Sequence, residues 1–162
     1  RKKIPVYADN LTKKYLKTNF SYCFKNSFDY PPTLELKKIK KMTIFKDKNL
    51  LLKIKAIPVK HGRIDCLSFI INNKCAYASD VNFIYKKNLK HFYNLKYLII
   101  DCLRISYHPS HYNLENVLKL IKILNPKKSI LTNLTSTLDY NFLLKQLPKN
   151  VVPAYDGMTF RI

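Results

Sequence analysis

Acidic and imidazole side chains stand directly after apolar, strand-like segments of this sequence. His61 follows the segment 51–59, and Asp80 ends the segment 75–80. Strand ends hold their side chains rigidly, so His61 and Asp80 can converge at one edge of a sheet. Imidazole nitrogen and carboxylate oxygen are ligands for zinc or manganese. The pattern predicts a metal site with His61 and Asp80 as ligands, although two ligands are too few to hold a catalytic metal.

Two further histidines, His108 and His111, lie between the apolar segment 97–103 and the amphipathic segment 113–124. In α/β sheets, this corner between a strand and a helix faces the ligand crevice. A histidine there can bind a phosphate or act as a general acid, so both are candidate substrate-binding residues. His111 is the stronger catalytic candidate because it lies closer to the start of the helix, where the helix dipole favours an anion.

Each of these residues also has a structural explanation. His61 can be a satisfied histidine in a surface turn before Gly62, and Asp80 can cap the segment that follows it. One of the two later histidines can pack against a neighbouring tyrosine. The sequence leaves these alternatives open. It contains no HxHxDH, HExxH, P-loop or GxSxG motif, so no serine nucleophile is expected.

Hydrophobic patterning predicts the elements that position these residues. Strands are expected at 4–8, 33–39, 51–59, 66–72, 75–80, 97–103 and 129–134, and helices at 11–20, 82–92, 113–124 and 138–147. The segment 151–162 is expected to close with a strand. The residues Asn72 and Asn73 favour a hairpin turn. The first half is a strand-rich meander and the second half alternates strand and helix, which predicts a layered α/β sandwich in a single domain over 1–162.

The net charge of +20 is typical of proteins that bind nucleic acid. Only four of the 30 basic residues are Arg, however, and the lysines are scattered along the chain. Arginine is the residue that most often hydrogen-bonds to base edges and binds phosphates through two N–H groups. Its scarcity therefore argues against a nucleic-acid partner. A coding bias towards A and T explains the many Lys and Asn residues, and the charge would still attract anionic substrates at low salt.

The apolar segments and the cysteines of the sequence bear on its cellular compartment and on membrane association. No stretch of 18 apolar residues and no signal peptide is present. The four cysteines have no CxxC spacing, and three of them lie in apolar strand-like segments. Free thiols in a reducing cytoplasm explain them better than disulfides or a zinc ribbon. We therefore expect a cytoplasmic protein without a membrane partner.

Taken in order, several segments resemble the metallo-β-lactamase superfamily, and within it the phosphoribosyl cyclic phosphate phosphodiesterase-like hydrolases. The resemblance covers essentially the whole chain and rests on IPVYA, IPVKHG, CAYASD, LIIDCLR, HPSHYNL, ILTNLTSTLDY and AYDGM. It implies a four-layer αββα sandwich. The family places an HxHxDH motif upstream of the IPVYA-like strand, so the chain resembles the carboxy-terminal two-thirds of the domain, truncated with its amino-terminal part missing.

The resemblance also implies roles for individual residues. His61 would bind the first metal, and Asp80 would bridge two Zn or Mn ions. His111 would face the phosphate as a proton donor or charge stabiliser. Asp156 and Gly157 would form the turn before the last strand. The implied activity is the hydrolysis of small phosphodiesters of the cyclic phosphate type.

Two departures from the family pattern change this expectation. The HxHxDH motif is absent, and the late family histidine falls at Asn133 or Thr135, which are poor zinc ligands. We therefore expect an incomplete or decayed hydrolase. The alternatives are an inactive remnant or binding module without turnover, and an RNA-processing nuclease-like protein. A missing part would leave a sheet edge and an apolar face exposed, which predicts self-association.

Overall fold

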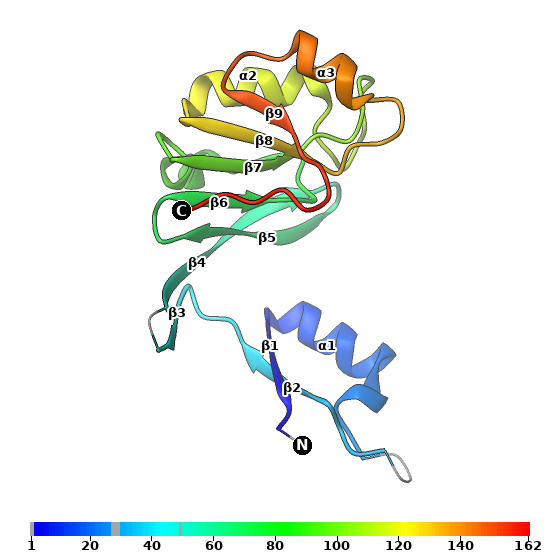
Figure 1. Ribbon diagram of the computed structural model, residues 1–162. Helices are drawn as coiled ribbons and strands as arrows, with labels where there is room; N and C mark the ends of the chain where they lie inside the picture. The colour runs from blue at the N-terminus through cyan, green and yellow to red at the C-terminus, as the bar shows by residue number, and fades with distance from the viewer. Residues whose placement is uncertain (1, 27–29, 49) are drawn as a thin grey trace. The chain divides into compact units, whose positions relative to one another are not determined.

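The protein forms two compact units, Arg1–Thr43 and Ile44–Ile162, in a computed structural model that describes residues 2–26, 30–48 and 50–162 (Figure 1). The prediction of a single domain over 1–162 stays a prediction. No helix among the described residues is long and apolar enough to cross a membrane.

The first unit holds a short parallel sheet and one helix. Strand β1 (Ile4–Ala8) pairs with β2 (Leu34–Lys38), and α1 (Asn10–Asn19) and the 3₁₀ helix η1 (Ser21–Cys23) lie between them in the chain. The carboxylate of Asp9 caps α1 by accepting a hydrogen bond from a backbone amide of the first turn at 2.9 Å. The strands predicted at 4–8 and 33–39 and the helix predicted at 11–20 are confirmed.

The second unit is built on a seven-stranded sheet whose strands follow in chain order. The strands are β3 (Met42–Asp47), β4 (Leu50–His61), β5 (Ile64–Ile71), β6 (Cys75–Ala78), β7 (Tyr97–Asp101), β8 (Lys128–Thr132) and β9 (Val151–Pro153). Strands β4 to β6 are antiparallel, and β6 to β9 are parallel. The predicted change from a meander to alternating strands and helices is therefore confirmed.

Local signals in the sequence explain several of these boundaries. Asn72 and Asn73 have φ angles of 52° and 54° and make the tight turn between β5 and β6. The helix α2 (Leu114–Leu124) begins at Asn113, whose side-chain oxygen accepts a hydrogen bond from a first-turn amide. It ends at Asn125, which has a left-handed conformation.

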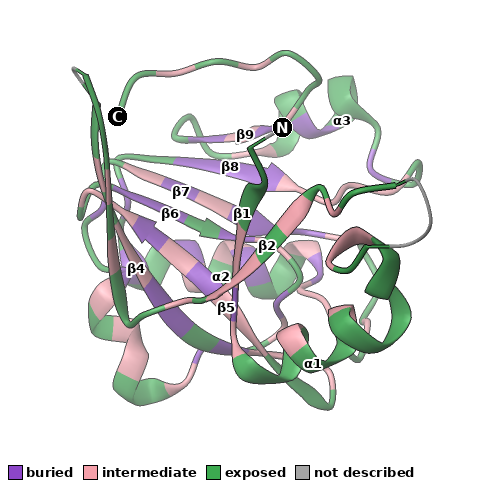
Figure 2. Cartoon of the chain, turned by 90° about the horizontal axis from the view of Figure 1, so that it is seen from below, coloured by how far each residue is buried: buried purple, intermediate pink, exposed green. Residues whose placement is uncertain are grey.

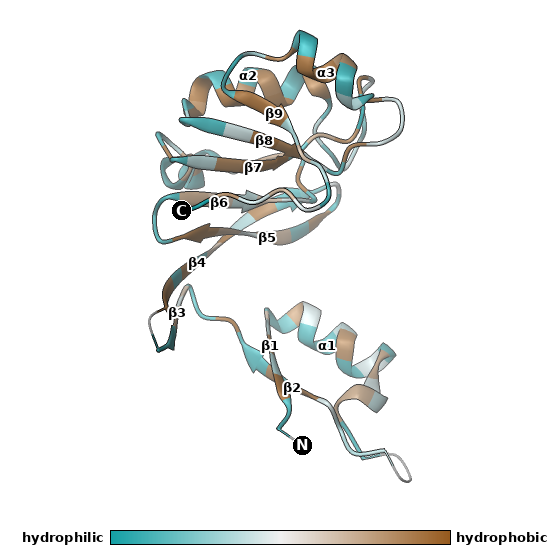
Figure 3. Cartoon of the chain, viewed as in Figure 1, coloured by the Kyte–Doolittle hydropathy of each residue, from teal (hydrophilic) through white to brown (hydrophobic). Residues whose placement is uncertain are grey.

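The core of the second unit lies between the sheet and α2. Leu98 and Ile100 point to one face of β7 and are fully buried, and they pack with Val117 and Leu124 of α2. Figure 2 shows buried residues along the strands of this sheet, including β4, β5, β7 and β8, and Figure 3 shows hydrophobic residues in the same strands. This burial stiffens the strands whose ends carry the candidate site.

Several elements differ from the predictions. Strand β3 was not predicted. The helix predicted at 82–92 is reduced to the 3₁₀ helix η2 (Lys86–His91), because Phe83 instead forms a bridge to the backbone of β4. The helix predicted at 138–147 is confirmed as α3 (Tyr140–Gln146).

The carboxy-terminal prediction was wrong in its extent. The last strand, β9, ends at Pro153, and the segment does not close with a strand because residues 154–162 form none. Asp156 and Gly157 do lie in a turn, with φ +85° at Gly157, but this turn follows β9 instead of preceding the last strand.

All four cysteines are free thiols, as predicted. Cys75 and Cys102 are buried, and Cys66 is partly buried. Burial raises the pKa of Cys66 and Cys75 to about 11 and that of Cys102 to about 12. These three thiols are therefore protonated and unreactive near neutral pH.

Candidate metal centre

Three acidic or imidazole side chains stand at strand ends of the second unit. His61 ends β4, Asp80 follows β6 by two residues, and Asp101 ends β7. Strands β6 and β7 run parallel and in register, so their carboxyl ends reach the same edge of the sheet. The loop after β7 brings His111 to this edge as well.

His61, Asp80 and His111 form one cluster. Their nearest ligand atoms all lie within 4.8 Å of one another. The Nε2 atoms of His61 and His111 are 3.2 Å apart, and the two rings meet edge to face. His61 and His111 are partly buried, whereas the Asp80 side chain is 59% exposed. The cluster is thus open to solvent on its carboxylate side.

A glycine turn and one asparagine set the distance between the two imidazoles. Gly62 has φ +60°, and its N–H donates to the side-chain oxygen of Asn82 at 2.9 Å. The amide of Asn82 donates to the carbonyl of Pro109 at 2.8 Å. A Cβ atom on Gly62 would come within 2.9 Å of the Ser110 Cβ. Close packing of this turn against the 108–111 loop therefore positions His61 opposite His111.

Asp101 is a residue of this site that the sequence analysis missed. It is fully buried, and its Oδ2 accepts hydrogen bonds from Val81 N at 2.9 Å and from His111 Nδ1 at 2.6 Å. Burial raises the pKa of Asp101, and the hydrogen bonds from Val81 and His111 oppose that shift. The sequence does contain a signal for Asp101, because it is the one charged residue in the apolar segment 97–103. Asp80 was selected from the same kind of pattern.

The Asp101 carboxylate determines how His111 presents its second nitrogen. A carboxylate can only accept, so the proton of the neutral ring lies on Nδ1. The lone pair of His111 Nε2 then faces the point shared with His61 and Asp80. A carboxylate behind an imidazole is the usual arrangement for orienting a metal ligand or a catalytic histidine.

His108 lies beside the cluster without joining it. Its ring centroid is 5.0 Å from that of His111, and its Nδ1 accepts a hydrogen bond from Ser110 N at 3.2 Å. Desolvation, with the positive charge of Arg104 nearby, lowers the pKa of His108. The ring is therefore neutral near pH 7, with its proton on Nε2.

The structure separates the two positions suggested for the late family histidine. Asn133 has φ 62° after β8, and its amide donates to Asp80 Oδ1 at 3.3 Å. Thr135 donates its hydroxyl to the carbonyl of Leu103 at 2.9 Å, which ties two loops together. Asn133 is thus the position that adjoins the cluster. Asp80 does not cap η2, whose first flanking residue is Tyr85.

The donor set fits a divalent metal ion. Two nitrogen ligands at about 2.0–2.1 Å from a tetrahedral zinc lie about 3.3 Å apart. The observed separation of the two Nε2 atoms is 3.2 Å. The carboxylate of Asp80 is also a ligand type that suits manganese. His61, Asp80 and His111 would therefore supply up to three donors to one ion.

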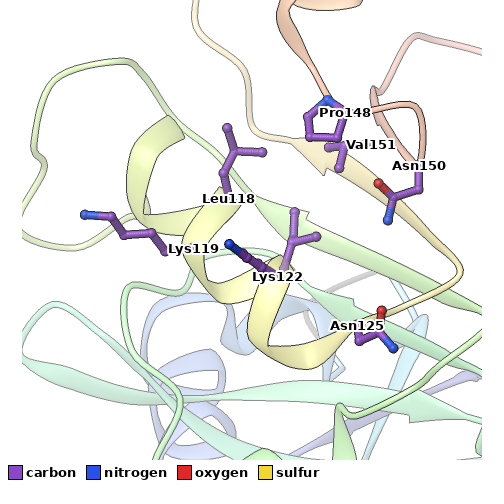
Figure 4. Close-up of a pocket in the computed structure, with 8 residues that line it drawn as sticks. Leu118, Lys119, Lys122, Asn125, Pro148, Asn150 and Val151 are labelled. Atoms are coloured by element: carbon purple, nitrogen blue, oxygen red, sulfur yellow. The ribbon is translucent and has the colours of Figure 1, made fainter.

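A separate cavity of about 480 Å³ lies on α2 and the segment that leads into β9 (Figure 4). It contains none of the cluster residues. Its lining consists of Leu118, Lys119, Ile121, Lys122, Asn125, Pro148, Asn150 and Val151.

Residues 1–133 match the family model of the beta-lactamase superfamily domain. The chain belongs to this family. No curated protein matches it. Among solved structures, a diphosphatase of the PhnP family has a TM-score of 0.83 and 25% sequence identity, and the match covers 97% of this chain and 57% of the diphosphatase. The chain thus spans little more than half the length of that protein.

Two further solved structures share the fold at lower identity. Zinc-bound PqqB from Methylobacterium extorquens has a TM-score of 0.74 and 10% identity, over 99% of this chain and 66% of PqqB. YhfI from Bacillus subtilis has a TM-score of 0.67 and 14% identity, over 95% of this chain and 63% of YhfI. The predicted superfamily and its α/β fold are confirmed. Of these similar structures, PqqB is zinc-bound and the PhnP-family protein is a diphosphatase.

Proposed function

We propose that this chain carries part of the catalytic centre of a metal-dependent hydrolase that acts on small phosphodiesters or related phosphate esters. One observation carries the proposal: the His61–Asp80–His111 cluster, in which buried Asp101 orients His111. The PhnP-family diphosphatase, similar over 97% of this chain, supports phosphate chemistry.

His61 and Asp80 would hold a divalent ion, zinc or manganese, and Asp80 would bridge to a second ion in the complete centre. When bound, such ions supply an activated water and positive charge against the phosphate. The openness of the site at Asp80, which is 59% exposed, leaves room for a substrate on that side.

His111 would stand against the phosphate as proton donor and charge stabiliser. Its Nδ1 is held by Asp101 at 2.6 Å, so its Nε2 is the nitrogen available to the substrate. The hydrogen bond to the Asp101 carboxylate also holds the ring in one orientation, which a catalytic histidine requires. His108, three residues earlier in the same loop, would also bind the substrate.

A non-enzymatic remnant is the second candidate, and Asn133 favours it. The amide of Asn133 donates to Asp80 Oδ1, the carboxylate that would bridge two ions. An amide is a poor zinc ligand, so the centre would hold one ion weakly or none.

Metal analysis and hydrolysis separate the two candidates. We expect the purified chain to hold zinc or manganese and to hydrolyse bis-p-nitrophenyl phosphate. His61→Ala and Asp80→Asn should lose the metal and reduce the rate by about 100-fold or more, since each removes a ligand. His91→Ala is the matched control, because His91 lies in η2 outside the cluster.

A chain without bound metal or hydrolysis, under conditions where its fold is intact, would exclude the hydrolase and leave the remnant. His111→Asn tests the role of His111. Retained metal with lost turnover is expected for a proton donor. Loss of the metal would make His111 a third ligand.

A further inference from the structure

We propose that the cavity on α2 and the segment before β9 binds a small organic anion, which combines an apolar body with a single carboxylate (Figure 4). The cavity has a volume of about 480 Å³, which is the size of a small-molecule site. It contains none of the residues of the His61–Asp80–His111 cluster. The inference therefore goes beyond the proposed function and does not depend on it.

The cavity lies at the opposite end of the parallel strands from the cluster. Strands β6 to β9 run parallel, and Asp80 and Asp101 stand at the carboxyl ends of β6 and β7. Val151, which lines the cavity, is the first residue of β9 and pairs with Ser129 near the start of β8. A ligand in the cavity would therefore not contact a substrate at the cluster.

Apolar side chains form one wall of the cavity. Ile121 of α2 and Val151 are 5% and 3% exposed. Leu118, three residues before Ile121 and on the same helix face, is partly buried. Pro148 adds to this wall from the segment that leads into β9. An apolar body that covers the wall removes it from water, which favours binding through the hydrophobic effect.

Two lysines of α2 also line the cavity, and one of them has no acidic partner. The Nζ of Lys119 is 2.6 Å from Oε1 of Glu115, within the same helix. Lys122 is exposed and takes part in none of the ion pairs between described residues. No acidic side chain is among the described residues that line the cavity. One unpaired ammonium beside an apolar wall complements a ligand with one negative charge.

Hydrogen bonds fix the segment that faces α2. The N–H of Val151 donates to the carbonyl of Pro148 at 2.8 Å, which closes a tight turn. The N–H of Ser129 donates to the carbonyl of Asn150 at 2.8 Å and fastens this turn to β8. The wall is therefore held in place before a ligand arrives, which reduces the entropy cost of binding.

The test uses octanoate as the probe and the amide spectrum of the full chain, labelled with nitrogen-15, as the readout. We expect saturable shifts of the Ile121, Lys122 and Val151 amides, and no shift at Gly62 or His111. Butyrate should bind about tenfold or more weakly, because it covers less of the apolar wall. Octyltrimethylammonium, which has an apolar chain of the same length but the opposite charge, should not bind at this place.

Lys122→Gln tests the charge. It should weaken octanoate binding about three- to fivefold, the worth of one exposed ion pair, and Lys122→Arg should retain the affinity. Lys90→Gln is the matched control, because it removes the same charge from η2, outside the cavity. It should leave the affinity unchanged, although the chain has a net charge of +20.

Three results would each overturn the proposal. They are shifts that do not saturate or that spread over the lysines of the surface, equal binding of octanoate and octyltrimethylammonium, and equal losses of affinity in Lys122→Gln and Lys90→Gln. None of these measurements needs a metal ion or hydrolysis, so a failure of the proposed function is recognised separately.

Discussion

At the scale of single residues, the centre depends on which nitrogen of each histidine is free. Asp101 holds His111 Nδ1 at 2.6 Å and leaves Nε2 facing His61 Nε2 at 3.2 Å. Ser110 imposes the opposite tautomer on His108. In this loop His111 therefore presents a lone pair on Nε2, and His108 presents an N–H donor on Nε2. Each role is set by the hydrogen bond that the other ring nitrogen, Nδ1, makes.

Asp101→Asn tests the orienting role. The amide keeps the size of the side chain but can present its N–H₂ group to His111 and favour the wrong tautomer. We expect hydrolysis to fall by about 10- to 100-fold. Nitrogen chemical shifts of His111 should report the change of tautomer. Asp139→Asn is the control, since asparagine caps α3 as well as aspartate does. Equal rates and unchanged shifts in both variants would contradict the role.

Asn133→His tests whether this position can supply a metal ligand. An imidazole there would replace an amide that lies 3.3 Å from Asp80 Oδ1. We expect zinc to bind about tenfold or more tightly, as measured by competition with a chromophoric chelator. Thr135→His serves as the control, because the Thr135 hydroxyl bonds to the Leu103 carbonyl. No gain in affinity would place Asn133 outside the coordination sphere.

At the scale of elements, the site is made where strands end and turns begin. Strands β4, β6 and β7 bring His61, Asp80 and Asp101 to one edge, and the loop before α2 adds His111. Asn82 joins the β4–β5 turn to this loop through hydrogen bonds of 2.9 and 2.8 Å. The geometry of the cluster therefore depends on how tightly two loops pack.

The two glycines allow a matched test of this packing. Both have positive φ, so each Gly→Ala change should destabilise the fold by about 1–2 kcal/mol. At Gly62 the new Cβ also meets Ser110 at 2.9 Å, whereas nothing lies within 4 Å at Gly157. We expect Gly62→Ala to cost about 1 kcal/mol more in urea unfolding and to lower hydrolysis.

Adding Ser110→Gly to Gly62→Ala should recover the extra loss of unfolding free energy but not the backbone strain. If Gly62→Ala and Gly157→Ala are equally destabilising, and the double variant shows no recovery, the contact with Ser110 does not determine the geometry of the cluster.

At the scale of the whole molecule, net charge and exposed apolar surface are the properties that affect substrate attraction and self-association. The chain carries a net charge of +20. Exposed large apolar side chains occur in both units, with Leu11 68% exposed in the first and Leu50 55% exposed in the second. The charge would attract anionic substrates, and the apolar surface favours association.

The charge predicts a strong dependence of hydrolysis on salt. Raising the ionic strength from about 0.01 to 0.5 M shortens the Debye length from about 30 Å to below 10 Å. We expect kcat/KM for an anionic phosphodiester to fall by about tenfold, mainly through slower association. A rate that is independent of salt would show that the surface charge does not guide the substrate.

Self-association is the second prediction at this scale. Analytical ultracentrifugation of the purified chain should show dimers or larger species at micromolar concentration, because apolar side chains stay exposed. Replacement of Leu11 by Lys should shift the distribution towards the monomer. A monomer with a sharp cooperative unfolding transition would contradict this prediction.

Local patterns predicted most of the elements. The apolar segments at 97–103 and 129–134 correctly predicted strands β7 and β8, because a parallel strand that is buried on both faces consists of continuous apolar residues. The helix at 113–124 followed from its amphipathic period, and the structure shows that Asn113 caps it. The predictions for 82–92 and 151–162 were wrong. The bridge from Phe83 to Lys60 and the end of the sheet at β9 depend on tertiary contacts, which local patterns do not encode.

By itself, the sequence determined the α/β class, the order of most elements and the chemical types available at the site, because burial patterns and donor atoms are local properties. Only the tertiary structure placed His111 with His61 and Asp80, and put buried Asp101 behind it. The same holds for Asn133 beside Asp80. These contacts join residues 10 to 53 positions apart, and their distances depend on strand register and loop packing, which no single segment encodes.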